Sequence, residues 1–295
     1  MKRLLILLYI SCLALLAATA QTVDGPRRTP PIEVQKDSVK VSLLTISAGD
    51  EIYTLYGHTA LRVREKNEAG WSDWVFNYGT FSFAQPHFIW RFMLGKTDYQ
   101  LGVVPYQLFF DTYAYEGRGI YEQQLNLSQP EGRDLVNRLA VNLHPDSVTY
   151  RYNFLYDNCV TRVIRRITQS VSDGQIIWPT AEAMQTRDLT LRDIVHQYAE
   201  EHPWDALGQD LLLGSEVDHP ASLQAQMFAP FYAQRYIAKA RIKHIDGTSA
   251  PLAGPVHTLL APAPRPQQST GVPSPMTCFG LLLALTLIVS AVEWV

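Results

Sequence analysis

Of the three cysteines in the sequence, only Cys159 lies in the part of the chain whose composition suits a folded body. Cys12 and Cys278 each lie within an apolar segment near one end of the sequence. If the body is exported, its lone cysteine has no partner for an intrachain disulfide and is a free thiol. A free thiol can act as a nucleophile that forms a covalent intermediate, so Cys159 is the first candidate for chemistry.

The residues around Cys159 predict an amphipathic helix that begins close to the thiol. Four apolar residues recur at helical spacing, namely Val160, Val163, Ile164 and Ile167. Asp157 and Asn158 are both suitable N-caps. The helix dipole makes a thiol at this position more acidic, whereas the carboxylate of Asp157 has the opposite effect. A small buried thiol can also pack like alanine, so the helix alone leaves both interpretations open.

His58 is the best candidate for a base that activates the thiol. Alternation predicts a strand in which His58, Ala60 and Arg62 share one face. Asn77 lies on the next predicted strand, where its amide could hold the imidazole in one tautomer. The backbone N–H of Cys159 would contribute to an oxyanion hole. The alternatives are a structural histidine at position 58 and a turn residue at position 77.

Hydrophobic patterns predict strands and helices in separate blocks, which is typical of an α+β fold. Strands are expected at residues 39–46, 58–64, 74–78, 100–104 and 119–127. Helices are expected at residues 107–115, 130–143, 157–168, 190–201 and 220–242. An antiparallel sheet packed on the helix that carries Cys159 would bring the strand residue His58 towards the thiol.

Composition indicates that this body is exported and anchored. Residues 1–20 are typical of a signal peptide, because a positive start and an apolar stretch precede Ala18-Thr19-Ala20; an uncleaved anchor is the alternative. Residues 21–38 are predicted as a spacer, 39–243 as the body, 244–275 as a proline-rich linker and 276–293 as a transmembrane segment. The net charge of −3 gives no electrostatic case for a nucleic-acid partner. The sequence contains no zinc-binding spacing and no cofactor motif.

Several short motifs, in order, resemble those of one envelope family. They are Ser47-Ala48-Gly49, Tyr56-Gly57-His58-Thr59-Ala60-Leu61-Arg62, Phe76-Asn77-Tyr78-Gly79-Thr80-Phe81 and Tyr152-Asn153-Phe154 followed by Asp157-Asn158-Cys159. The family is the N-terminal periplasmic domain of the Lnb-type lipoprotein N-acyltransferases, formerly a domain of unknown function. The likeness covers roughly residues 39–166. The order of the histidine and the helix-start cysteine also resembles permuted papain-like domains of the NlpC/P60 kind, which implies that His58 is the base and Asn77 its orienter.

The resemblance implies acyl transfer through a thioester, without a cofactor, on the periplasmic side of the inner membrane. Cys159 would take an acyl chain from a membrane phospholipid or another acyl donor. It would then pass the chain to the N-terminal amine of a diacylated lipoprotein. Two other functions stay open: an NlpC/P60-like cysteine hydrolase (a peptidase or esterase) of the cell envelope, and a non-catalytic envelope binding domain. The family's acyltransferases carry several C-terminal spans, whereas one is expected here.

Overall fold

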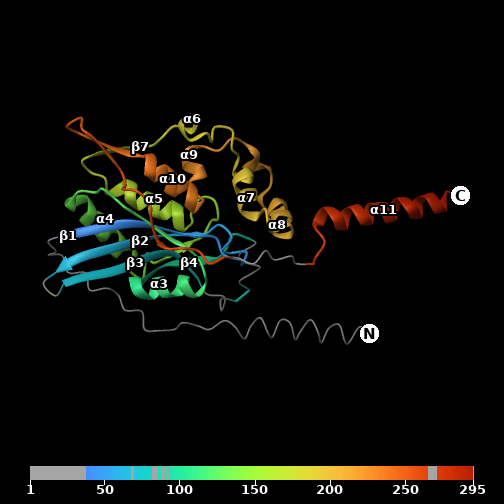
Figure 1. Ribbon diagram of the computed structural model, residues 1–295, viewed down its shortest axis with the longest axis horizontal. Coiled ribbons are helices and arrows are strands. Elements are labelled where there is room, and N and C mark those ends of the chain that lie inside the picture. Colours follow the sequence, from blue (N-terminus) through green and yellow to red (C-terminus); the bar gives the residue numbers. More distant parts are fainter. Residues whose placement is uncertain are drawn as a thin grey trace.

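The computed structural model describes residues 38–67, 70–81, 86–87, 91, 94–264 and 271–294. Within them the chain is α+β: an antiparallel sheet carries helices on both faces, and one long helix projects from the body (Figure 1). The predicted signal peptide, residues 1–20, and the spacer, residues 21–38, lie outside the described residues apart from Ser38. The α+β class and the antiparallel sheet are confirmed, and the permuted papain-like arrangement stays a prediction.

In the described residues, seven strands form the main sheet, in the order β10-β5-β1-β2-β3-β4-β6, and each neighbouring pair is antiparallel. In chain order they are β1 Ser38–Ile46, β2 His58–Asn67, β3 Gly70–Thr80, β4 Asp98–Pro105, β5 Ile120–Gln124, β6 Thr149–Arg151 and β10 His257–Leu260. β2 and β3 extend beyond their predicted ends. The predicted strand ends at residue 64 because polar residues follow it, but Glu65 and Lys66 continue the ladder with β1.

Helices cover both faces of this sheet, so strand β1 is buried on both sides. The helix α3 (Tyr106–Tyr115) packs on one face, and α4 (Gln129–Asn142), α5 (Cys159–Ser170) and α10 (Pro230–Lys239) pack on the other (Figure 1). Successive side chains of β1 alternate between the layers. Leu43 belongs to the cluster that includes α4 and α5, and Leu44 to the cluster that includes α3. This packing holds the N-terminus of α5 close to β2 and β3.

A second group of elements packs beside α5 and α10. It comprises β7 Gly174–Ile177, α6 Ala181–Met184, α7 Leu191–Ala199, α8 Pro203–Leu213, the 3-10 helix η1 Ser215–Asp218, α9 Leu223–Gln226, β8 Arg241–His244 and β9 Ser249–Pro251. The predicted helix over residues 220–242 is wrong as a single element, because it divides into α9, α10 and β8. Pro230 occupies the first turn of α10, where a missing N–H is harmless, and it cannot continue a preceding helix.

The predicted linker over residues 244–275 needs correction. Strand β9 pairs with β8, and β10 pairs with β5 at the edge of the main sheet. Between them Leu252 and Ala253 are buried in the core. The proline and glycine content suggested a linker, but Pro251 ends an edge strand, where proline costs no ladder hydrogen bond. The folded body therefore extends to residue 260.

The helix α11 (Pro275–Glu293) coincides with the predicted transmembrane segment over residues 276–293. It has a mean hydropathy of 2.1 over its most apolar stretch and buries none of that stretch in the body. Among the described residues, it is the one helix long and apolar enough to cross a membrane. The hydroxyl of Ser274 caps its first turn by accepting from the Thr277 N–H.

Candidate active site

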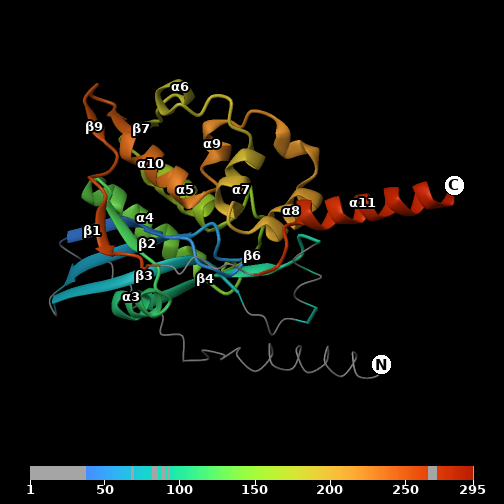
Figure 2. The ribbon, with the colours of Figure 1, turned by 45° about the vertical axis from the view of Figure 1, so that its right-hand side comes forward.

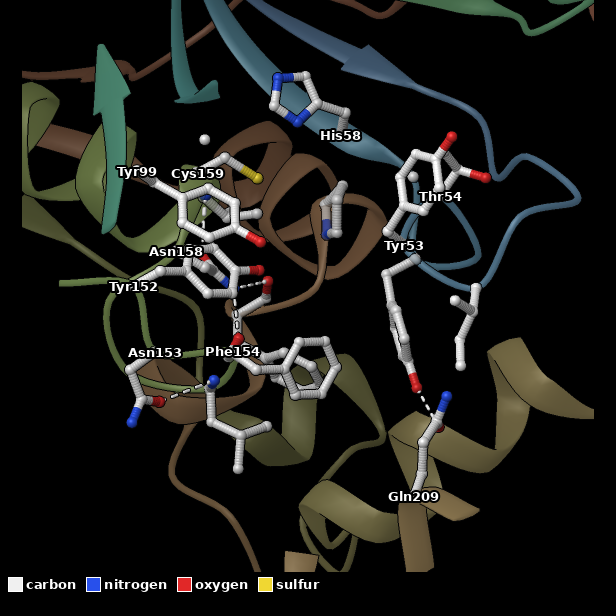
Figure 3. Close-up of a pocket in the computed structure, with 18 of the residues that line it drawn as sticks. Tyr53, Thr54, His58, Tyr99, Tyr152, Asn153, Phe154, Asn158, Cys159 and Gln209 are labelled. Atoms are coloured by element: carbon white, nitrogen blue, oxygen red, sulfur yellow. Dashed lines mark hydrogen bonds between the residues drawn. The ribbon is translucent and has the colours of Figure 1, made fainter. Parts of the chain in front are cut away.

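The three predicted site residues meet at one end of the main sheet. His58 opens β2, Asn77 lies close to the end of β3, and Cys159 opens α5. All three line a cavity of about 690 Å³ whose wall is otherwise largely aromatic and apolar. Figure 3 shows His58 and Cys159 at this cavity. Strand and helix ends that are far apart in the sequence therefore supply one common site.

The N-cap of α5 fixes the position of Cys159. The side-chain oxygen of Asn158 accepts hydrogen bonds from the backbone N–H groups of Val160 and Thr161, both at 2.9 Å. Its side-chain nitrogen donates to the carbonyl oxygens of Phe154 at 2.8 Å and Phe228 at 2.9 Å. Aspartate would also cap the helix but could not donate to the two carbonyls. Asn158 thus ties the helix start to two other segments of the body, and the predicted helix start is confirmed.

Burial dominates the acidity of the thiol. It raises the pKa of Cys159 to about 11, although backbone N–H groups of Thr59, Val160 and Cys159 itself, directed at the sulfur, lower the pKa. The expected influence of Asp157 is weakened, because its carboxylate pairs with the guanidinium of Arg162 at 2.7 Å. The resting site therefore holds a neutral thiol, with hydrogen-bond donors in place for the sulfur anion.

His58 is neutral for the same physical reason. Burial lowers its pKa to about 4, the hydrogen bond with Asn77 raises it, and the positive charge of Arg118 lowers it. The Nε2 atom pairs with the Oδ1 of Asn77. An amide oxygen can only accept, so Nε2 carries the proton and Nδ1 is left as the acceptor of the neutral ring. Asn77 is thus placed to hold the imidazole in this tautomer, as its predicted position on the strand after His58 requires.

The strand register explains how His58 reaches Asn77. Leu61 pairs with Phe76, and continuing this register places Asn77 across from Ala60 and Gly79 across from His58. Asn77 is therefore a diagonal neighbour of His58 on the same face, within reach of a long side chain.

Gly79 lies between the imidazole and the thiol. A Cβ atom at this position would lie 3.5 Å from the Cβ of Cys159 and 3.7 Å from the Cε1 of His58. Its φ of +94° lies in the region that favours glycine. The thiol of Cys159 and the imidazole of His58 line the same cavity. Among the described residues, the hydrogen bond of the imidazole is to Asn77, and none joins it to the thiol. Such contacts commonly tighten when a substrate binds.

The cavity also contains residues that the sequence did not single out as functional. The rings of Tyr99 and Tyr152 stack with centroids 4.1 Å apart, next to Cys159 (Figure 3). Arg118 is buried and donates to the carbonyl oxygen of Ser47 at 2.9 Å. Tyr152 lies in a quoted motif, whereas Tyr99 and Arg118 lie in none, and only the folded chain brings them to the site.

One more wall of the cavity comes from α8. Its Gln209 accepts a hydrogen bond from the hydroxyl of Tyr56 at 2.5 Å.

No group of three histidine, cysteine, aspartate or glutamate residues in the described part of the chain is arranged to hold a metal ion. Cys159, His58 and Asn77 thus place a thiol, an imidazole and an amide where a nucleophile, its base and an orienting group would need to be.

Comparison with known proteins gives one match. The family of the Lnb N-terminal periplasmic domain matches residues 32–197, which is more than half of the chain. No curated protein and no solved structure matches the chain. The matched region includes His58, Asn77 and Cys159 and ends before α8. With α11, the match indicates a membrane-anchored protein with a periplasmic domain.

Proposed function

Since the chain belongs to the Lnb N-terminal periplasmic domain family, we propose that it is a lipoprotein N-acyltransferase of the inner membrane that uses Cys159 as its nucleophile. The observation that carries the proposal is the meeting of Cys159 with the His58–Asn77 pair in one largely apolar cavity. A cavity of about 690 Å³ lies within the ordinary size range of ligand pockets, and its lining suits an acyl chain. The order of the residues also supports the permuted papain-like relationship.

The first half-reaction forms a thioester. The Sγ of Cys159 attacks the carbonyl carbon of an acyl ester in a membrane phospholipid, and the thiol proton passes to the Nδ1 of His58. The backbone N–H of Cys159, at the start of α5, stabilises the oxyanion that forms on the carbonyl oxygen. The tetrahedral intermediate then expels the lysophospholipid alkoxide, which takes the proton from His58 and leaves as an alcohol.

The second half-reaction transfers the acyl chain to an amine. The N-terminal amine of a diacylated lipoprotein attacks the thioester carbon and gives a proton to His58. The intermediate expels the Cys159 thiolate, which takes this proton back. Asn77 holds the imidazole in the required tautomer during both steps.

A reporter experiment tests this proposal. The full chain is placed in vesicles whose phospholipid carries deuterated acyl chains, together with a diacylated reporter lipoprotein, and the reporter's N-terminal peptide is analysed by mass spectrometry. We expect one added deuterated acyl group with the wild type and with Cys278→Ala, the matched cysteine control, and none with Cys159→Ala. An unmodified reporter with the wild type would contradict the proposal.

The same experiment separates the other two functions. Release of deuterated fatty acid that depends on Cys159, with no modified reporter, would identify a hydrolase in which water takes the place of the amine. No acyl group on Cys159, no released acid and no modified reporter would identify a non-catalytic binding domain.

A further inference from the structure

The helix α8 exposes an apolar stripe. Trp204, Gly208, Leu211 and Leu212 recur at the spacing of one helix face, and all four are exposed. The exposed fractions are 79% for Leu211, 59% for Leu212 and 42% for Trp204. An amphipathic helix normally turns such a face to the core. Here the α8 stripe, defined as these four residues, is exposed, and Trp204, Gly208 and Leu212 also line the active-site cavity.

Polar contacts hold α8 in this orientation. The guanidinium of Arg192, on α7, pairs with Asp210 at 2.5 Å and donates to the carbonyl oxygen of Gly214 at 2.5 Å. The imidazole of His196 also contacts Asp210, at 2.8 Å. On the cavity side, Gln209 bonds to Tyr56. These contacts, together with the packing of Leu213 against the core, fix the orientation of α8 that leaves the stripe exposed.

The stripe adjoins the candidate membrane span. The indole Nε1 of Trp204 donates to the carbonyl oxygen of Pro273 at 2.9 Å, and its ring lies 6.5 Å from that of Phe279 in α11. Figure 2 shows α8 beside the end of α11 that joins the body. If α11 crosses a bilayer, α8 lies at the level where it enters. Tryptophan is enriched at that level, since its indole has an apolar body and a polar N–H.

Other large apolar side chains surround the mouth of the active-site cavity. Ile52, Tyr53 and Tyr156 are each about half exposed and line the same cavity as Trp204 and Leu212. The mouth of the cavity and the α8 stripe therefore share part of one apolar surface, which continues into α11 through Trp204 and Phe279.

We propose that the α8 stripe lies in the lipid interface of the membrane that α11 enters, so that the cavity of Cys159 opens towards that leaflet. Association by this surface needs no chemistry at Cys159. The further conclusion that acyl chains enter the cavity over α8 rests on the proposed function. None of the four residues of the stripe is charged, so apolar burial and not anionic lipid drives the contact.

Fluorescence quenching tests the location of the stripe. The full chain is reconstituted in nanodiscs of phosphatidylcholine brominated in the acyl chains, and the emission of the Trp204→Phe variant is subtracted from that of the wild type. The difference isolates one of six tryptophans. We expect it to be quenched relative to unbrominated nanodiscs and unaffected by added salt. If a second copy of the chain or another protein covers the stripe, Trp204 is not quenched, and the proposal is overturned.

A pair of aspartate substitutions tests the functional consequence. Leu211→Asp changes an exposed residue outside the cavity lining, and Val141→Asp, 68% exposed in the last turn of α4, is the matched control. We expect Leu211→Asp to reduce the quenching of Trp204 and to slow acylation of Cys159 by vesicle lipid about tenfold, the effect of losing one buried leucine contact. Val141→Asp should change neither.

Alkylation of Cys159 by water-soluble iodoacetamide checks that both variants are folded and should be unchanged. Acylation by Leu211→Asp at the wild-type rate, with Trp204 still quenched, would overturn the entry route. If Cys159 is never acylated by lipid, the proposed function fails, but the quenching still decides whether the stripe lies in the membrane.

Discussion

Cys159 should be a slow thiol in the resting protein, and the pH dependence of its alkylation tests this directly. Burial places the pKa of Cys159 at about 11, compared with 9.0 for an ordinary thiol. At neutral pH this difference lowers the thiolate population about a hundredfold. A more basic thiolate is also a better nucleophile, so each thiolate reacts about tenfold faster and offsets part of this loss. The net expectation is alkylation about tenfold slower than that of an unperturbed cysteine.

The assay follows iodoacetamide labelling of Cys159 in the full chain by peptide mass spectrometry, from about pH 6 to about pH 10. The rate should rise about tenfold per pH unit without a plateau, because the thiolate is the reactive form. His58→Gln should leave this profile within about twofold, because a neutral imidazole contributes no charge that could stabilise the thiolate.

A preformed thiolate–imidazolium pair predicts a different result. The rate would then be nearly constant between the two pKa values and would fall when His58 is replaced. A plateau below about pH 8 in the wild type, lost in His58→Gln, would refute the reasoning from burial.

Three further predictions concern stability and geometry; stability is measured by urea unfolding of the full chain in detergent, and acylation of Cys159 by peptide mass spectrometry. Because the pKa of His58 is about 4 when folded and 6.5 as an ordinary histidine, the unfolded chain binds more protons between these values, and stability should fall by about 3 kcal/mol as the pH drops from 6.5 to 4. His58→Gln should remove this component. Asn158→Asp should lower the free energy of unfolding by about 3 kcal/mol, because the carbonyls of Phe154 and Phe228 lose their donor. An unchanged midpoint of the urea transition would contradict this. Gly79→Ala should lower the free energy of unfolding by about 1–2 kcal/mol, because alanine is strained at a positive φ. It should also slow acylation of Cys159, because the added methyl group lies between the thiol and the imidazole.

Local patterns predicted the parts of the site that depend on neighbouring residues. The helix start at Cys159 follows from a capping residue and four apolar positions, and the histidine-bearing strand follows from alternation. The pairing of His58 with Asn77 follows from two adjacent strands joined by a short connection. Each of these features depends on residues that lie within about twenty positions of one another, and periodic patterns of that length predict helices and strands.

Features that depend on distant contacts were not predictable. Tyr99 reaches the site through β4, Arg118 through its contact with Ser47, and Gln209 through α8, and no local pattern marks these positions. The assignment of residues 244–275 to a linker failed for the same reason. Proline and glycine content indicates a loop, while membership of a sheet edge depends on β5, which lies more than a hundred residues away.

The burial that suits an acyl chain also suppresses both charges of the proposed catalytic pair. A cavity lined by aromatic rings disfavours the thiolate of Cys159 and the imidazolium of His58 alike. Attack on an ester therefore has to couple proton transfer to the formation of the carbon–sulfur bond, so that no isolated charge forms in the resting cavity. The N–H groups of Thr59, Val160 and Cys159 already point at the sulfur, so they stabilise the partial negative charge that it carries while its proton leaves and again while the thioester breaks. An enzyme arranged in this way keeps its thiol unreactive towards soluble electrophiles and reserves it for a substrate whose carbonyl is held beside these donors. The predicted slow alkylation and the proposed use of a membrane ester therefore have one common cause, the burial of Cys159.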